Sequence, residues 1–214
     1  MRIALFETIT PGNIGAVARA MKNFGFKELL LVNPQCSHLD NESLQRACHG
    51  VDILSEAKLV GERELFKHYV AGTTSKAFTR KTHRQAATPD KLGFLPSEAV
   101  MLFGREDNGL PNRVLKKCDT VITIPTSTSY SSLNLSHAVA IILYELKVSG
   151  LNKKSISAGY RGEILKRFYN LSDLCGRDES LKEYLKNVFN RSIIYESEAK
   201  ALMGLLTELE KQLK

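Results

Sequence analysis

The sequence predicts an α/β protein: a parallel sheet with helices on both faces, followed by a small all-helical C-terminal extension. Two patterns in the 214 residues support this fold class. Short apolar runs alternate with helical spacing through residue 148, which is typical of strand–helix–strand units and a parallel sheet. Beyond the alternating region only helical spacing remains. We therefore expect an α/β domain over residues 1–150 and a helical extension over residues 158–214.

The first elements are predicted from apolar runs and turn signals near the N-terminus. Residues 2–6 (RIALF) form a short apolar run, as a buried parallel strand requires. Residues 10–12 (TPG) signal a turn, and Asn13 can cap a helix that ends at Gly25. A second apolar strand (LLLV) follows at residues 29–32. The chain thus begins with a strand–helix–strand unit.

The same pattern continues to residue 148. In chain order we expect a helix at residues 42–48, a helical piece at 62–67, a strand at 69–71, a loop to 89, a strand at 99–103, a short helix around 114–115, a strand at 121–124 and a long helix at 134–148. Residues 149–155 are polar and glycine-containing, which is typical of a linker. The extension then predicts three helices, at residues 163–174, 180–189 and 196–213.

Composition excludes several classes of protein. An apolar share of 43% and a charged share of 25% are ordinary for a globular protein and exclude a disordered, collagenous or coiled-coil chain. No stretch approaches the ~18 uninterrupted apolar residues of a membrane span. Glu7 interrupts the N-terminal apolar run before a signal-peptide core can form. We therefore expect a cytoplasmic protein without a membrane partner.

The charge and the cysteines give weaker indications. The net charge of +7 favours a polyanionic partner without proving one. Four cysteines are present without a CxxC pair, and their spacing with the histidines fits no standard zinc frame, so we expect reduced thiols and no metal. Residues 65–89 contain no acid, which makes this segment the basic surface most suited to phosphate contacts. Its candidate RNA-binding residues are Lys76, Arg80, Lys81 and Arg84.

Three polar, glycine-containing segments follow predicted strands, where ligands bind in open parallel sheets. They are residues 11–15 leading to Arg19, residues 104–111, and residues 124–136. Taken alone, each segment can also be explained as a tight turn or a solvated loop without a ligand. None matches the glycine fingerprint of dinucleotide-binding sites or the P-loop, so a standard nucleotide site lacks support.

Together the three segments carry a family resemblance. The first matches Asn-x-Gly-x-x-x-Arg followed by Phe-Gly, here Asn13, Gly15, Arg19 and Phe24-Gly25. The second matches Phe-Gly-x-Glu-x-x-Gly-Leu, here Phe103 to Leu110. The third matches Ile-Pro, a spacer and Ser-Leu-Asn-x-Ser, here Ile124-Pro125 and Ser132 to Ser136. The sequence resembles the TrmH-type branch of the SPOUT superfamily, which are S-adenosylmethionine-dependent RNA 2′-O-ribose methyltransferases.

The resemblance implies a fold, a cofactor and an assembly. The fold would contain a trefoil knot near the last two motifs, which general topology rules would not predict. The cofactor would be S-adenosylmethionine, without a metal, and the protein would be a homodimer whose sites are completed by the partner chain. The residues that would bind the cofactor are Thr73, Thr74, Ser75, Gly104, Arg105, Gly109, Leu110, Ile124, Ser131, Ser132 and Leu133.

The resemblance also implies catalytic residues. Arg19 would hold the target phosphate and stabilise the developing alkoxide, because arginine stays cationic and is a poor free base. Four polar residues would position Arg19, the ribose or the cofactor: Asn13, Glu106, Ser132 and Asn134. Tyr130, just before the serine pair, is a candidate for stacking on a base, since the chain has no tryptophan.

The extension narrows the resemblance to one type. Residues 189–191 (FNR), followed by Glu196, Glu198, Leu202 and Gly204, resemble the C-terminal extension of TrmJ-type enzymes, which methylate the ribose at tRNA position 32. The expected substrate is therefore tRNA, with either cytidine alone or both cytidine and uridine accepted. Three alternatives stay open: another tRNA or rRNA nucleotide, a catalytically silent RNA-binding module, and a Rossmann-like nucleotide binder. The Asn13/Arg19 pair argues against the silent module.

Overall fold

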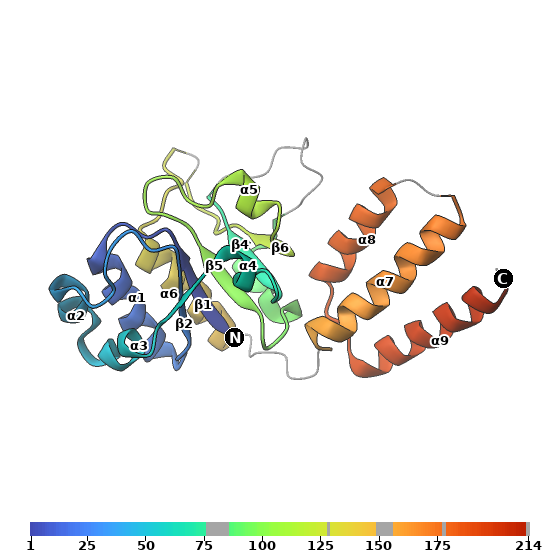
Figure 1. Cartoon of the computed structure of the whole chain (residues 1–214), viewed down its shortest axis with the longest axis horizontal. Coiled ribbons are helices and arrows are strands. Elements are labelled where there is room, and N and C mark those ends of the chain that lie inside the picture. The colour runs from blue at the N-terminus through green and yellow to red at the C-terminus, as the bar shows by residue number, and fades with distance from the viewer. Residues whose placement is uncertain (76–85, 128, 149–155, 177–178, 213–214) are drawn as a thin grey trace.

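The computed structural model is built around one six-stranded parallel sheet (Figure 1). It describes residues 1–75, 86–127, 129–148, 156–176 and 179–212. The strand order is β3-β2-β1-β5-β4-β6, and every neighbouring pair is parallel. The strands are β1 (Arg2–Phe6), β2 (Leu29–Val32), β3 (Lys58–Val60), β4 (Val70–Thr73), β5 (Val100–Phe103) and β6 (Thr120–Ile122).

Helices cover both faces of this sheet. One face packs against α1 (Pro11–Phe24), α2 (Asn41–Ala47), η1 (Cys48–Gly50), α3 (Val51–Ser55), η3 (Pro89–Phe94) and α6 (Leu135–Val148). The other face packs against α4 (Glu62–Leu65) and α5 (Asn112–Leu115). Strand β1 is apolar on both faces because helices cover both. Its Ile3 and Leu5 side chains point to the first face, those of Ala4 and Phe6 to the second, and all four are fully buried. A continuous apolar run is therefore what this strand requires.

The predicted parallel sheet is confirmed, with differences at individual elements. Strand β3 was not predicted, because Lys58 and Leu59 are exposed on an edge strand of three residues and give no buried apolar run. Strand β4 runs to Thr73, beyond the predicted end at residue 71, and β6 ends at Ile122 rather than 124. Helix η3 begins at residue 89, where the predicted loop ends, in a stretch to which the sequence assigned no element. The predicted linker at residues 149–155 lies outside the described residues.

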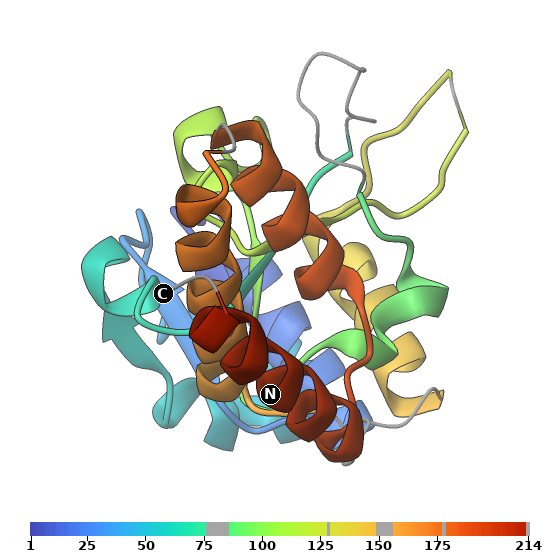
Figure 2. The same ribbon diagram turned by 90° about the vertical axis from the view of Figure 1, so that its right-hand side faces the viewer.

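The C-terminal extension consists of α7 (Ala158–Leu174), α8 (Glu179–Arg191) and α9 (Glu196–Gln212). The three helices lie beside one another at one end of the molecule, on the right in Figure 1 and facing the viewer in Figure 2. Helix α7 begins five residues before the prediction because the Ser157 hydroxyl caps it, accepting a 3.2 Å hydrogen bond from the Tyr160 backbone N–H. Buried apolar residues of the extension, including Ile164 and Leu206, form a hydrophobic cluster distinct from the two clusters of the sheet.

The extension contacts the amino ends of β4, β5 and β6. The Tyr69 hydroxyl donates a 2.8 Å hydrogen bond to the Asn190 carbonyl, and Asn190 Nδ2 donates one of 2.8 Å to the Asp119 carbonyl. Arg161, only 1% exposed, donates to the carbonyls of Phe189 and Ser192 at the end of α8. Burial lowers the pKa of the Arg161 guanidinium. The Tyr69 and Asn190 contacts hold the extension against the sheet, and the Arg161 contacts join α7 to the end of α8.

No helix among the described residues is long and apolar enough to span a membrane.

Candidate functional site

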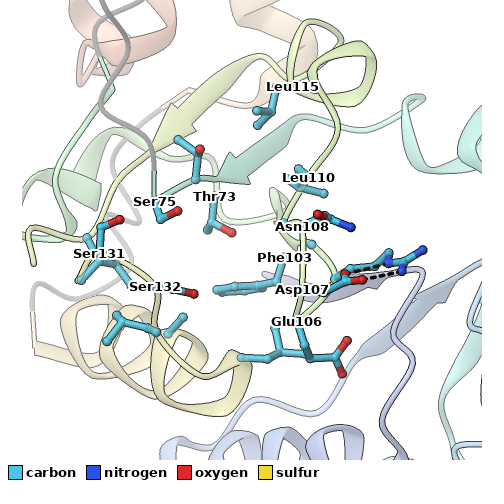
Figure 3. Close-up of a pocket in the computed structure, with 18 of the residues that line it drawn as sticks. Thr73, Ser75, Phe103, Glu106, Asp107, Asn108, Leu110, Leu115, Ser131 and Ser132 are labelled. Carbon is cyan, nitrogen blue, oxygen red and sulfur yellow. Dashed lines mark hydrogen bonds and ion pairs between the residues drawn. The ribbon is translucent and has the colours of Figure 1, made fainter. Parts of the chain in front are cut away.

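A cavity of about 570 Å³ opens at the carboxyl ends of β4 and β5 (Figure 3). This volume falls within the range of ~300–1,000 Å³ that small-molecule sites occupy. Most of the lining comes from three parts of the chain: residues 73–75 at the end of β4, residues 103–110 at the end of β5, and Ile124 with residues 131–133 after β6. Every residue that the sequence predicted for cofactor binding lies in this lining: Thr73, Thr74, Ser75, Gly104, Arg105, Gly109, Leu110, Ile124, Ser131, Ser132 and Leu133.

The cavity lining also includes residues that the sequence patterns did not assign to it. Phe103 ends β5, and Leu115 ends α5. Both look like ordinary core residues in the sequence, because they end buried apolar runs, yet both border the cavity (Figure 3). Asp107, Asn108, Asn112, Leu135 and Ala138 were likewise missed. Phe103, Asp107 and Asn108 lie within the second motif, which was the available signal.

Gly104 gives the second segment its shape. A Cβ at this position would overlap the backbone of Gly109 and Leu110, so only glycine allows the segment to fold back so closely on itself. Gly109 closes the turn with φ of +67°, a conformation that glycine adopts without strain. The turn also carries a 2.9 Å hydrogen bond from the Gly109 N–H to the Arg105 carbonyl. The cavity wall at this turn is therefore set by backbone packing.

Hydroxyl groups line the opposite side of the cavity. Ser131 and Ser132 are exposed, and the Ser132 hydroxyl faces the same space as the Phe103 ring (Figure 3). Thr73 donates a 3.1 Å hydrogen bond from Oγ1 to the Leu102 carbonyl, which ties the end of β4 to β5. Ser132 is thus the predicted catalytic residue that the cavity presents most directly to a ligand.

Charge in the cavity lining is unevenly balanced. Arg105 Nη2 lies 2.7 Å from Asp107 Oδ2, and this hydrogen bond holds the pKa of the Asp107 carboxyl below its usual range. Glu106 is a second carboxylate in the lining, against the single guanidinium of Arg105. The lining therefore carries a net negative formal charge, which suits a ligand with a positive centre.

A hydrogen-bonded cluster beside the cavity joins the three motifs. The Glu106 carboxylate accepts hydrogen bonds from the backbone N–H groups of Ile9 (3.2 Å) and Thr10 (3.3 Å) and from Asn13 Nδ2 (3.1 Å). Asn134 Nδ2 in turn donates to Asn13 Oδ1 at 3.2 Å. Three predicted catalytic residues, Asn13, Glu106 and Asn134, are therefore in direct contact.

Arg19 lies elsewhere. It is exposed on α1, does not line the cavity of its own chain, and donates from Nη1 to the Cys48 sulfur at 3.6 Å. The expectation that Asn13, Glu106, Ser132 or Asn134 positions Arg19 finds no hydrogen bond among the described residues of one chain. Cys48 was not foreseen as its neighbour, because that contact depends on η1 packing closely against α1.

The predicted basic residues Lys76, Arg80, Lys81 and Arg84 all lie outside the described residues. Within the described ranges, no group of three or more His, Cys, Asp or Glu side chains is arranged to hold a metal ion.

The fold and the site define the class of this protein. Residues 1–144 match the SpoU rRNA Methylase family, so the chain belongs to that family. The tRNA (cytidine-2′-O-)-methyltransferase TrmJ of Methanocaldococcus jannaschii is 34% identical over 218 residues, which cover 90% of this chain and 92% of that protein. The tRNA (cytidine/uridine-2′-O-)-methyltransferase TrmJ of Yersinia pestis strain Pestoides F is 30% identical over 237 residues, covering 99% and 92%.

A solved structure is similar to this chain over almost its whole length. The structure of a probable methylase family protein from Haemophilus influenzae Rd KW20 matches with a TM-score of 0.72 and 30% identity. The match covers 99% of this chain and 96% of that one, so the similarity includes the helical extension.

Proposed function

We propose that this protein is a TrmJ-type, S-adenosylmethionine-dependent tRNA methyltransferase that methylates the ribose 2′-hydroxyl at position 32 of the anticodon loop. Cytidine is the proposed target, and uridine is the second nucleoside to test. The observation that carries the proposal is that the second and third motifs, far apart in sequence, line one cavity, while Asn13 of the first motif is hydrogen-bonded to Glu106 and Asn134 beside it. Membership of a methylase family and the names of the two TrmJ relatives support the same activity.

The cavity suits S-adenosylmethionine in size, polarity and charge. Apolar faces from Phe103, Ile124 and Leu133 can contact an adenine ring, while nearby backbone N–H and C=O groups can hydrogen-bond its edge. The negative balance of the lining suits a positively charged sulfur. When bound, S-adenosylmethionine supplies a methyl group that is already activated for attack by a hydroxyl oxygen. The chain then has to align the 2′-hydroxyl with that methyl group.

Arg19 is proposed to act on the substrate rather than on the cofactor. Its guanidinium remains a cation at neutral pH, so it can bind the phosphate beside the target ribose and stabilise negative charge on the attacking oxygen. Ser132 is proposed to hydrogen-bond the 2′-hydroxyl from the cavity side. The cluster of Asn13, Glu106 and Asn134 is proposed to hold the start of α1 against the cavity wall.

We also propose a homodimer in which Arg19 of one protomer serves the cavity of the other. The position of Arg19 supports this arrangement, because it is exposed and outside the cavity of its own chain. Dimerisation brings a second copy of every surface group close to the site, which is how an exposed residue can complete it.

The knot and the division into domains are also proposals. The backbone around the cavity is proposed to form a trefoil knot, a proposal supported by the family resemblance and by β6 pairing with β4 rather than with β5, the strand before it in sequence. Residues 1–150 and 158–214 are proposed as separate domains, supported by their distinct hydrophobic clusters.

Lys76, Arg80, Lys81 and Arg84 are proposed to contact the RNA backbone. An enzyme that modifies tRNA works where tRNA is, so a cytoplasmic location is proposed.

The test is a direct assay with unmodified tRNA and S-adenosylmethionine, followed by mass-spectrometric mapping of ribose methylation. Calorimetry gives cofactor affinity separately. Arg19→Ala should abolish turnover while leaving cofactor affinity largely intact. Absence of cofactor binding by the wild-type protein would reject the methyltransferase. Cofactor binding with methylation at another nucleotide would redirect the substrate, and RNA binding without cofactor binding would favour a silent RNA-binding module.

A further inference from the structure

Tyr130 is exposed and directly precedes two residues that line the cavity. Its side chain is 77% exposed, the largest exposure of any large apolar side chain among the described residues. A single exposed apolar residue is ordinary on a protein surface and requires no explanation by itself. The position of Tyr130 in the chain is what sets it apart, because the next two residues, Ser131 and Ser132, both line the cavity.

The segment that carries Tyr130 follows β6 and projects from the body of the protein (Figure 2). Hydrogen bonds hold it together at two places. Thr126 Oγ1 donates to the Ser131 carbonyl at 3.3 Å, and the hydroxyl oxygens of Ser127 and Ser129 lie 2.7 Å apart. The first of these bonds joins residues on the two sides of Tyr130 and so holds its backbone next to Ser131, which lines the cavity, whereas the second lies before Tyr130.

The composition of this segment restricts what it can bind. Between residues 126 and 132, every residue other than Tyr130 is serine or threonine, and none is charged. Such a segment has no cation with which to attract a phosphate. Its one extended apolar surface is the tyrosine ring, which fits the flat face of a nucleobase. Proteins recognise single-stranded RNA by stacking aromatic side chains on unstacked bases.

We propose that the Tyr130 ring stacks on the nucleobase of the target nucleotide and so places its ribose over the cavity. This inference rests on the proposed function and adds a substrate-positioning residue to it. Stacking contacts the face of a base and is tolerant of sequence, because every base has a π-face. Tyr130 therefore provides affinity for the target base without distinguishing cytidine from uridine.

Three substitutions at Tyr130 separate stacking from other roles. Loss of stacking on one base costs about 1–3 kcal/mol, so Tyr130→Ala should lower kcat/KM for tRNA about 5- to 150-fold. Tyr130→Phe should stay close to wild type because the ring remains, and Tyr130→Leu should fall between the two. Cofactor affinity by calorimetry should be unchanged in all three variants.

Leu59→Ala is the matched control. Leu59 is 65% exposed on β3, at the opposite edge of the sheet from β6, and its loss should leave kcat/KM unchanged. A tRNA that lacks only the base at the target position identifies the contact. Wild-type enzyme should lose on this substrate about what Tyr130→Ala loses on normal tRNA, and Tyr130→Ala should lose nothing further.

Several results would overturn the stacking role. Equal activity of Tyr130→Ala and wild type would remove it, and a Tyr130→Phe variant as poor as Tyr130→Ala would assign the effect to the hydroxyl. A Tyr130→Ala protein that sediments as a monomer while wild type is a dimer would make Tyr130 a subunit contact. In each case the wild-type protein still methylates tRNA, whereas failure of the proposed function shows as no methylation by wild type.

Discussion

Glu106 illustrates how one side chain organises this site. Its carboxylate accepts three hydrogen bonds, two of them from backbone N–H groups that precede α1, and it connects the segment after β5 to the start of that helix. Charged hydrogen-bond acceptors of this kind are stronger than neutral ones. Glu106 therefore fixes the position of α1, the helix that also carries Arg19.

Glu106→Gln should destabilise the protein, because the amide has one acceptor oxygen and cannot serve Ile9, Thr10 and Asn13 together. The expected loss is about 1–3 kcal/mol, measured as a lower Tm in thermal unfolding. Asp107→Asn is the matched control: its carboxylate forms its ion pair with Arg105 at the surface, so little stability should be lost. Equal Tm values for Glu106→Gln and wild type would show that the cluster does not hold α1.

At the scale of elements, the turn after β5 depends on close backbone packing. Gly104→Ala should lower both stability and S-adenosylmethionine affinity, because the added Cβ overlaps Gly109 and Leu110 and must push the cavity wall outward. Calorimetry and thermal unfolding measure the two effects. Gly162→Ala on the exposed surface of α7 meets no neighbour and should instead stabilise by about 0.5–1 kcal/mol. Unchanged affinity in Gly104→Ala would mean that this wall does not contact the cofactor.

Also at the scale of elements, we predict that the attachment of α8 to the sheet stabilises the protein. Asn190→Ala removes the donor to the Asp119 carbonyl at a position that is only 3% exposed. The expected cost is about 1–3 kcal/mol, with faster amide exchange in α7 to α9, because the hydrogen bond that joins α8 to the part-buried Asp119 carbonyl is lost. Glu183→Ala, on an exposed part of α8, should change neither. Cofactor affinity should be retained, since this attachment lies at the amino ends of the strands.

Sequence patterns predicted the buried elements well and the edges poorly. Residues 2–6 and 29–32 are apolar on both faces, which few structures other than a covered parallel strand require. Strand β3 left no such pattern because its Lys58 and Leu59 side chains face solvent. The strand order was also beyond the sequence, because pairing β6 with β4 depends on contacts between distant segments.

In the candidate site, too, the sequence predicted some residues and could not predict others. The second and third motifs anticipated most of the residues that line the cavity, since both follow strands and the carboxyl ends of parallel strands share one edge. Phe103 and Leu115 could not be distinguished from core residues, because a side chain at a strand or helix end is apolar in either role. The contact between Arg19 and Cys48 required knowledge of how η1 packs on α1.

At the scale of the whole molecule, the position of Arg19 predicts that activity can be restored by mixing inactive variants. In a homodimer with shared sites, an Arg19→Ala protomer still has an intact cavity, and a Gly104→Ala protomer still has Arg19. Random re-pairing of equal amounts should give half mixed dimers with one complete site each, or about a quarter of wild-type activity. If Arg19 serves its own chain, the mixture will show only the average activity of its two parents.

The extension and the cavity lie at opposite ends of the same strands, and this separation sets a minimum length for any RNA that contacts both. Tyr69 and Asp119 hold α8 at the amino ends of β4 and β6, whereas Thr73 borders the cavity at the carboxyl end of β4. Four strand residues span about 13 Å, which corresponds to about four nucleotides at ~3.4 Å each in a stacked strand. An RNA that touches both must extend at least that far beyond the target nucleotide. Oligonucleotides trimmed below that length should therefore show a higher KM at unchanged kcat, whereas intact tRNA should not.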